Sequence, residues 1–147
     1  MPEPNQRPPV DDLVEVLHAR GQRVTSQRLV ILRELRRRAQ HATAHEVCEA
    51  VRDELPGTSP PTVYATLDLL AELGLVRKLD AGVGVSLYDA RTEAHQHMAC
   101  RRCGLVEDLD GDLDAEPLLR AARAAGFAPA HAELVISGLC ARCAAAG

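Results

Sequence analysis

Apolar residues in the first half of the chain recur every three or four positions, which is the spacing of amphipathic helices. The pattern predicts helices over residues 11–20, from Thr25 onward, from Thr43 to about residue 54, and over residues 59–73. The first of these segments is followed by Gly21, a residue type that commonly ends a helix. The first half of the chain is therefore expected to be mainly helical.

Local signals mark where the third and fourth predicted helices begin. Thr43 followed by Glu46 matches a capping box, in which the two side chains satisfy each other's backbone amides. Ser59 is a good N-cap residue, and it precedes Pro60-Pro61, which the first turn of a helix tolerates. Residues 41–43 lie between two predicted helices and are expected to form a connector.

The hydrophobic pattern changes after residue 74. Residues 75–79 and 85–88 flank a glycine-bearing turn at residues 80–84, which predicts a β-hairpin. Several helices followed by a hairpin are typical of a winged helix-turn-helix domain. We therefore expect residues 1–88 to form a winged-helix domain and residues 89–94 to be a hinge.

Residues 95–147 are expected to form a second, smaller domain. Short apolar segments at 95–100, 105–109 and 132–139 predict strands, and residues 116–125 predict one helix. The fold class predicted for the whole chain is therefore α+β, with a winged-helix domain followed by a small α/β domain. The few elements of the second domain can bury only a small apolar area. We therefore expect a bound metal and a partner subunit to support this domain.

Four of the five cysteines occur as two C-x-x-C pairs, Cys100/Cys103 and Cys140/Cys143. Each pair can place both sulfurs on one tetrahedral ion, which predicts a structural Zn²⁺ site with four thiolate ligands. Redox-active or free buried cysteines are the alternative, although a thioredoxin-type pair would occur once, between a strand and a helix. Cys48 stands apart and is expected to be a small core residue.

His95 and His97 precede the first cysteine pair. Side chains two apart on a strand point to the same side, so the two imidazoles can bind one ion. The sequence therefore predicts a second metal site, distinct from the four cysteines.

The formal net charge of −4 argues weakly against a nucleic-acid-binding protein. The distribution of charge changes this picture, because arginines are concentrated in the predicted helical half. They indicate a local basic surface and are Arg20, Arg23, Arg28, Arg33, Arg36, Arg37 and Arg38.

No apolar run is long enough to predict a transmembrane helix, so no membrane association is expected. Residues 1–9 are polar and proline-rich, unlike a secretory signal. We therefore expect a cytoplasmic protein, in which clustered cysteines are more often metal ligands than disulfides.

Five segments occur in an order and at intervals that resemble the ferric uptake regulator (Fur) family of bacterial metal-dependent repressors. They are V-T-S-Q-R (24–28), T-V-Y (62–64), A-E-L-G-L-V (71–76), H-Q-H-M-A-C-R-R-C-G (95–104) and G-L-C-A-R-C (138–143). The resemblance implies a homodimer that binds a palindromic DNA operator, with winged-helix domains and a central α/β dimerisation domain. It implies neither an enzyme nor a protein with a small-molecule substrate.

The resemblance also implies that His41, Asp89 and Asp108 join His95 and His97 in a regulatory site. Three imidazoles and two carboxylates suit Fe²⁺ or Mn²⁺, although Zn²⁺ or Ni²⁺ would also bind such a set. The choice of Asp108 depends on strand register, because Glu107 precedes it and alternate residues face opposite sides.

Aspartate at positions 89 and 108 resembles the peroxide-sensing branch of the family, whereas iron-sensing members tend to carry glutamate. In that branch peroxide reacts at bound Fe²⁺ and oxidises a ligating histidine, which by position would be His41 or His95. A sensor of iron, manganese, zinc or nickel availability is the alternative within the family. A further family site is expected to be absent or weak, because Ala94 and Gln96 occupy two of its positions.

The helix over residues 59–73 would read DNA. Thr62 and Tyr64 would contact the duplex, and Arg23 and Arg28 would contact backbone phosphates. Ala65 departs from the family, which often has Arg or Asn there. Packing rather than DNA contact is the alternative role for Tyr64.

Two alternatives from other classes remain open on the sequence alone. One is a thiol or metal redox enzyme that uses His95, His97 and Asp89, with Cys48 as a reactive thiol. The other is a zinc-stabilised interaction module without a regulatory metal. Sustained turnover would favour the first, and DNA binding that does not respond to metal would favour the second.

Overall fold

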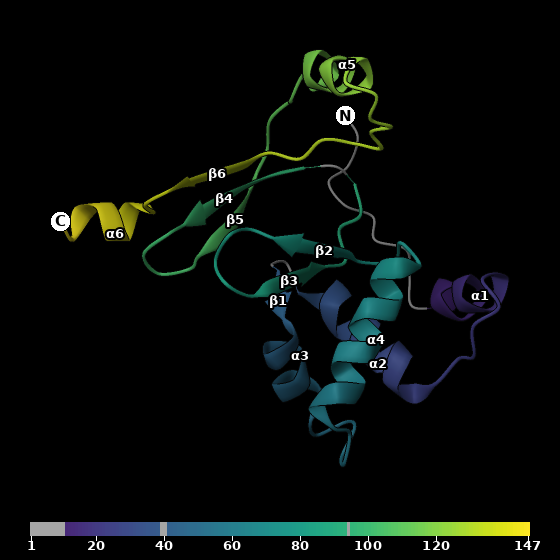
Figure 1. Cartoon of the computed structure of the whole chain (residues 1–147). Helices are drawn as coiled ribbons and strands as arrows, with labels where there is room; N and C mark the ends of the chain where they lie inside the picture. Colours follow the sequence, from purple (N-terminus) through teal and green to yellow (C-terminus); the bar gives the residue numbers. More distant parts are fainter. Residues whose placement is uncertain (1–10, 39–40, 94) are drawn as a thin grey trace. The chain divides into compact units, whose positions relative to one another are not determined.

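The computed structural model describes residues 11–38, 41–93 and 95–147. The predictions for residues 1–9 and for Ala94 therefore lie outside the described residues. Two compact units are present, one within Met1–Asp80 and Val85–Thr92 and the other within Ala81–Gly84 and Glu93–Gly147 (Figure 1). None of the helices in the described ranges combines the length and hydrophobicity needed to span a bilayer.

The first unit contains the predicted helices. They are α1 (Asp11–Ala19), α2 (Ser26–Arg37), α3 (Ala44–Val51) and α4 (Pro60–Glu72), and α4 packs against α2 and α3 (Figure 1). Helix α3 ends three residues before the predicted limit, and turns replace its last part. Pro56, which has no N–H to donate, and Gly57 at φ +80° follow closely and prevent helical hydrogen bonding from continuing.

Side chains cap α2 and α3, and the cap of α3 is the one that the sequence predicts. Thr25 Oγ1 accepts a hydrogen bond from the Arg28 N–H at 3.3 Å. At α3 the capping box is complete, because Thr43 Oγ1 accepts from the Glu46 N–H at 3.1 Å and Glu46 Oε2 accepts from the Thr43 N–H at 2.7 Å. Ser59 occupies the N-cap position of α4 without a side-chain cap bond, and its hydroxyl lies 3.0 Å from that of Thr62.

The predicted hairpin is confirmed as β2 (Arg77–Asp80) and β3 (Ser86–Asp89). The expectation of a plain connector at residues 41–43 was wrong in part. Ala42–Thr43 form a short strand, β1, that pairs antiparallel with β3 and gives the sheet order β1-β3-β2. Two residues are too few to show a strand period, so only the pairing with β3 reveals this strand.

The first unit has a well-formed hydrophobic core, built mostly from Leu, Val and Ile. The helices contribute one buried stripe each, and Tyr88 contributes the one aromatic ring from β3. The buried core residues are Leu13, Leu17, Ile31, Leu32, Leu35, Ala42, Ala44, Val47, Val51, Val63, Leu67, Leu70, Leu75, Val76 and Tyr88.

The second unit is a three-stranded sheet with two helices. Strands β4 (Gln96–Cys100), β5 (Val106–Leu109) and β6 (Val135–Gly138) are arranged in the order β5-β4-β6, with β4 antiparallel to β5 and parallel to β6. Helix α5 is Glu116–Ala124, and α6 (Ala141–Ala145), which the sequence pattern did not predict, begins directly after Cys140 and contains Cys143. The α+β fold class is confirmed.

Strand β6 is shorter than the predicted 132–139. The Gln96 side-chain carbonyl accepts a hydrogen bond from the Leu134 N–H at 2.8 Å, just before β6 begins. The Leu134 carbonyl accepts from the His97 N–H at 3.1 Å, whereas the Leu134 N–H bonds to this side chain, and the strand itself begins at Val135. Gln96 is therefore a structural residue at the edge where β6 joins the sheet.

The second unit has little apolar interior. Among its described residues after Glu93, the buried apolar side chains are only Ala99, Cys100 and Cys143. Helix α5 contains no buried residue, and Leu118 and Phe127 are 65% and 69% exposed. Hydrocarbon burial within one chain therefore contributes little to the stability of this unit.

The capping box yields a test of the first unit. Replacing Thr43 with Ala removes the acceptor for the Glu46 N–H, and we expect the free energy of unfolding to fall by about 1 kcal/mol. Urea denaturation followed by circular dichroism measures this loss. Ser59→Ala is the matched control at another N-cap, where no side-chain cap bond exists, and it should cost clearly less. Equal losses would contradict a role for the capping box.

Candidate metal and DNA-binding sites

The structure brings the four predicted zinc ligands together in the second unit. Cys100 ends β4 and Cys103 lies in the turn before β5, while Cys140 is the N-cap residue of α6 and Cys143 lies within this helix. Their four sulfurs lie within 4.8 Å of one another, and the Cys103 and Cys140 sulfurs are 3.8 Å apart. Four thiolates held ~2.3 Å from one tetrahedral Zn²⁺ would have sulfurs ~3.8 Å apart, so the arrangement suits structural zinc.

Backbone hydrogen bonds shape the first cysteine turn. The Cys100 N–H donates to the Leu105 carbonyl at 2.8 Å, and the Gly104 N–H donates to the Cys100 carbonyl at 2.9 Å. Gly104 has φ +75°, a conformation that favours glycine and lets the chain reverse directly after the second cysteine. Arg102 then donates from Nη1 to the Cys143 carbonyl at 2.8 Å, which ties the first turn to the second.

The surroundings shift the pKa of three of the cysteine thiols. Backbone amides of Cys103 and Cys140 hydrogen-bond to the Cys100 sulfur and lower the pKa of this thiol to about 6. The Leu105 amide likewise lowers the pKa of Cys103. The hydrogen bond with the Cys140 sulfur raises the pKa of Cys143 to about 12. Zn²⁺ binds cysteine as the thiolate, so a bound ion would displace the proton that the raised pKa of Cys143 otherwise retains.

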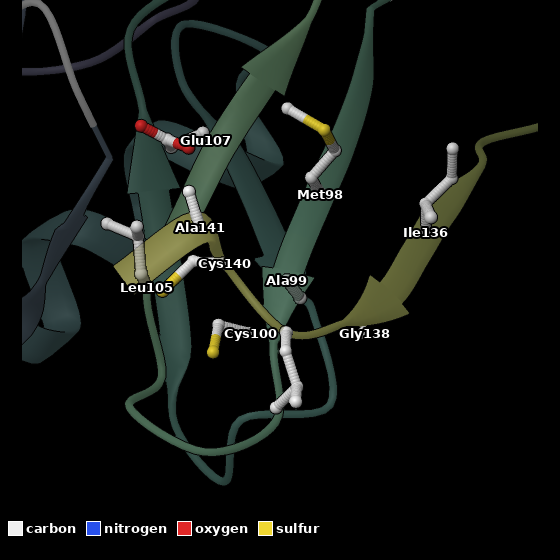
Figure 2. A pocket seen from close by; sticks show the side chains of 10 residues that line it. Met98, Ala99, Cys100, Leu105, Glu107, Ile136, Gly138, Cys140 and Ala141 are labelled. Atoms are coloured by element: carbon white, nitrogen blue, oxygen red, sulfur yellow. The ribbon is translucent and has the colours of Figure 1, made fainter. Parts of the chain in front are cut away.

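An apolar groove runs along the sheet beside the cysteines. Figure 2 shows Met98 of the central strand β4 between Leu105 on one side and Ile136 on the other, with Cys100 and Cys140 toward one end. The groove has a volume of about 290 Å³, and it is lined also by Glu107, which pairs with Met98 across β4 and β5. Glu107 thus faces the groove rather than the side of the sheet that carries His97.

The second unit also gathers three nitrogen and oxygen ligands on the other face of this sheet. His97 is paired with Asp108 in the β4–β5 register. The Nε2 atoms of His95 and His97 are 2.9 Å apart, and Asp108 Oδ1 lies 3.3 Å from the first and 3.7 Å from the second. Two ligands ~2.1 Å from one ion at angles of ~85–125° are ~2.8–3.7 Å apart, so these atoms have suitable spacing for a shared metal.

A backbone contact fixes the tautomer of His95. Its Nδ1 lies 2.8 Å from the Glu93 carbonyl oxygen, which can only accept a hydrogen bond. Nδ1 therefore carries the proton, and Nε2 presents its lone pair toward His97 and Asp108. His95 and His97 are 4% and 3% exposed, so the ligand atoms are held in a largely dry site.

The first unit holds the other two predicted ligands next to each other. His41 Nε2 lies 3.5 Å from Asp89 Oδ2, at the ends of β1 and β3. The second carboxylate oxygen, Oδ1, accepts the Arg91 N–H at 2.8 Å, which orients the group. Asp89 is 7% exposed, and burial of a carboxylate is costly unless the group is paired or hydrogen-bonded.

The predicted DNA-contacting residues lie on α4 and around the start of α2. Thr62, Tyr64 and the departing residue Ala65 are exposed on the first turns of α4, and Tyr64 is 49% exposed. Arg28 Nη1 donates to the Arg23 carbonyl at 2.6 Å, so the two arginines lie together. The exposure of Tyr64 disfavours the alternative of a packing role.

Not all of the predicted basic surface is free to meet a polyanion. The buried Glu34 accepts hydrogen bonds from Arg37 Nη2 at 2.7 Å and from Arg38 Nε at 3.0 Å. Burial is the largest single influence and raises the pKa of the Glu34 carboxyl. The hydrogen bonds and charges of Arg37 and Arg38 together outweigh it, so the pKa lies below its ordinary value. Arg37 and Arg38 are thus partly neutralised within α2, in contrast to the arginines near its beginning.

Comparison with known proteins agrees with this geometry. The family model described as the ferric uptake regulator family matches residues 19–137. The chain belongs to the ferric uptake regulator family. Members of this family and its structural neighbours are metal-dependent transcriptional regulators and not enzymes.

Two characterised relatives represent different branches of the Fur family. The transcriptional regulator FurA of Mycobacterium tuberculosis is 35% identical over 135 residues, covering 91% of each chain. The peroxide operon regulator of Bacillus subtilis is 36% identical over 134 residues, covering 90% of this chain and 91% of that protein.

Solved structures of Fur-family proteins share this fold. The Helicobacter pylori Fur structure has a TM-score of 0.75 at 19% identity, covering 92% of this chain and 91% of that one. Pseudomonas aeruginosa Fur with manganese has a TM-score of 0.65 at 30% identity, covering 86% and 96%. A zinc uptake regulator in complex with zinc and DNA has a TM-score of 0.67 at 28% identity, covering 95% and 98%.

Sequence reasoning missed the residues that support these ligands. Arg102 joins the cysteine turns, and the Glu93 carbonyl sets the His95 tautomer. The only sequence signal for them is that each lies within two residues of a predicted ligand. Their partners are a distant carbonyl or a local backbone group, which no residue pattern encodes.

Removing one sulfur tests the zinc cluster. We expect Cys143→Ser to lower bound zinc from about one ion per chain to near zero, because a structural tetrahedral site needs all four ligands. Plasma mass spectrometry of purified protein measures the zinc content. Cys48→Ser is the control, since Cys48 lies on α3 in the other unit, and it should retain full zinc. Loss of zinc in both variants would argue against this assignment.

Proposed function

We propose that this protein is a homodimeric, metal-dependent transcriptional repressor that responds to peroxide through a regulatory Fe²⁺ site. The observation that carries the proposal is the pair of pre-oriented ligand sets, His41 with Asp89 in the first unit and His95, His97 and Asp108 in the second. Three imidazoles and two carboxylates suit Fe²⁺ or Mn²⁺. The four cysteines hold structural Zn²⁺ in the same proposal.

Both ligand sets bind the same ion in this proposal. Asp89 ends β3 of the first unit, and His95 immediately precedes β4 of the second. Only a short segment of chain therefore connects Asp89 of one set to His95 of the other. An ion that takes ligands from both units favours the arrangement in which all five reach it. It shifts the population toward that arrangement by its differential affinity for the two states.

DNA binding is assigned to the first unit. Tyr64 and Thr62 project from the exposed start of α4, and Arg23 and Arg28 lie near the beginning of α2. A phenol ring suits contact with a base edge, whereas guanidinium groups suit backbone phosphates. A homodimer presents two such helices, which would match a palindromic operator.

The dimer contact is assigned to the second unit. Much hydrocarbon is left uncovered within one chain. It lies in the groove beside the cysteines, on α5 and on the turn that follows this helix. Exposed apolar patches of this kind mark protein–protein contacts. A second copy of the chain is the occupant that this proposal requires.

Peroxide sensing is favoured by the two aspartates among the ligands and by the imidazole rings, which can be oxidised. Bound Fe²⁺ supplies the electron-transfer chemistry that makes H₂O₂ reactive at the site. H₂O₂ gives one oxygen atom to a ring carbon of His41 or His95 and leaves as water, so the imidazole loses two electrons. An oxidised ring is a poorer ligand, and the loss of metal would release the DNA.

A sensor of metal availability is the second candidate. The chain is about equally identical to FurA, at 35%, and to the peroxide operon regulator, at 36%, so identity does not separate the branches. In that case the same five ligands report the concentration of Fe²⁺, Mn²⁺, Zn²⁺ or Ni²⁺ without oxidation of a histidine.

The shared ion can be tested by removing a ligand from each unit. We expect His41→Ala and His95→Ala each to weaken Mn²⁺ binding by at least about tenfold and to abolish metal-stimulated binding to a DNA duplex selected from a random pool. Isothermal titration and gel shifts provide the measurements. His131→Ala, at an exposed histidine, is the control and should bind Mn²⁺ normally. If His41→Ala left Mn²⁺ affinity intact, the two sets would not share one ion.

The peroxide response predicts a defined mass change. Iron-loaded protein exposed to a small excess of H₂O₂ should gain ~16 Da on the peptide that contains His41 or His95, as peroxide oxidation of a ligand at a redox-active ion requires. The manganese-loaded protein should not change, because Mn²⁺ does not support this chemistry. Peptide mass spectrometry reads both results. An unmodified iron-loaded protein would favour the metal-availability sensor.

A further inference from the structure

A hydrogen-bonded group of three side chains connects the sheet of the first unit to α4. The Tyr88 hydroxyl donates to Asp68 Oδ1 at 2.9 Å, and Lys78 Nζ donates to the same oxygen at 2.9 Å. The Lys78 ammonium also lies 5.7 Å from the centre of the Tyr88 ring, within cation–π range. Asp68 belongs to the helix that carries Thr62 and Tyr64, so this group holds the proposed DNA-reading element.

Tyr88 occupies the middle of the sheet. It pairs with Ala42 of β1 on one side and with Lys78 of β2 on the other. His41 directly precedes Ala42, the first residue of β1, and Asp89 directly follows Tyr88 at the end of β3. The strand that ends with a proposed metal ligand therefore carries the α4 contact one residue earlier.

Strand geometry separates the two contacts to opposite faces. Successive side chains on β3 alternate, so the Asp89 carboxylate turns toward His41 while the Tyr88 ring turns toward α4. The ring is 2% exposed and packs in the same core as Val63 and Leu67 of α4. A displacement of β3 at Asp89 would therefore also move the Tyr88 phenol.

The hydrogen bond is well suited to transmit such a displacement. A bond to a charged carboxylate is stronger and more direction-dependent than one between neutral groups. Asp68 and Lys78 side chains are about half exposed, at 47% and 46%, so their ion pair alone is worth little. The buried phenol is the element that fixes the carboxylate, and with it α4, relative to β3.

We propose that Tyr88 is a positioning residue that couples the His41–Asp89 metal ligands to the orientation of α4 through its hydrogen bond to Asp68. The proposal rests on the proposed function, because it requires that metal at Asp89 changes DNA binding. With the ion bound, β3 is held where the phenol reaches Asp68, and α4 is set for the duplex. Without it, this hydrogen bond is made less often, and the helix samples orientations that bind DNA less well.

The test uses a DNA duplex that manganese-loaded wild-type protein has selected from a random pool. It measures how much Mn²⁺ increases the affinity of each protein variant for this duplex. Tyr88→Phe removes only the hydroxyl and keeps the ring in the core. We expect this variant to lose about fivefold of the metal-dependent gain in DNA affinity, a typical size for one element of a coupling network. Its Mn²⁺ affinity without DNA should stay close to that of the wild type.

Asp68 variants show whether the effect passes through this bond. Asp68→Ala should reduce the gain to a similar extent, and the Tyr88→Phe, Asp68→Ala double variant should be no worse than either single variant. Glu49→Gln, which breaks an exposed ion pair with Arg52 on α3, is the control and should keep the full gain. Circular dichroism melting verifies folding. If Tyr88→Phe does not fold, the surface variant Asp68→Asn takes its place and should also lower the gain.

The results of these experiments distinguish failure of the Tyr88 coupling from failure of the proposed function. Wild-type protein whose DNA affinity ignored Mn²⁺ would overturn the proposed function. A wild type that responds to Mn²⁺ together with a Tyr88→Phe variant that responds equally would overturn only the coupling role. A variant that melts at lower temperature with an unchanged metal gain would likewise reduce Tyr88 to a stabilising residue.

Discussion

The second unit depends on four sulfur atoms because it has almost no apolar interior of its own. A three-stranded sheet with α5 exposed along its length cannot offset the conformational entropy of some fifty residues by hydrocarbon burial. The cysteines connect the turn after β4 to the segment after β6, two parts of the chain that are distant in sequence. His97 and Asp108 lie on the same sheet, so the connection between the cysteines also supports the strands that carry them.

The parts of the fold that the sequence predicts are those with strong local signals. The capping box at Thr43, the prolines after Ser59 and the hairpin around residues 80–84 all stand where their patterns place them. Strand β1 and helix α6 escape prediction because each is short and exists through contacts with distant residues. The start of β6 escapes for the same reason, since a side chain of β4, Gln96, sets it.

The ligand residues divide in a similar way. The cysteine pairs and the His95–His97 pair follow from spacing alone, whereas His41, Asp89 and Asp108 follow only from resemblance to a family. Strand register distinguishes Asp108 from Glu107: the first pairs with His97, and the second pairs with Met98 and faces the groove. No pattern in the sequence contains that register, because it is set by hydrogen bonding between two strands.

The two kinds of ligand set also explain how one small unit can support two metals without exchange between them. Four thiolates around a tetrahedral ion leave no open position, and they favour zinc over the harder divalent ions. Imidazole and carboxylate ligands suit Fe²⁺ and Mn²⁺, bind them less tightly and permit release. In the proposed function, the sulfur site would keep the unit folded when the nitrogen–oxygen set is empty, as a site that reports metal concentration requires.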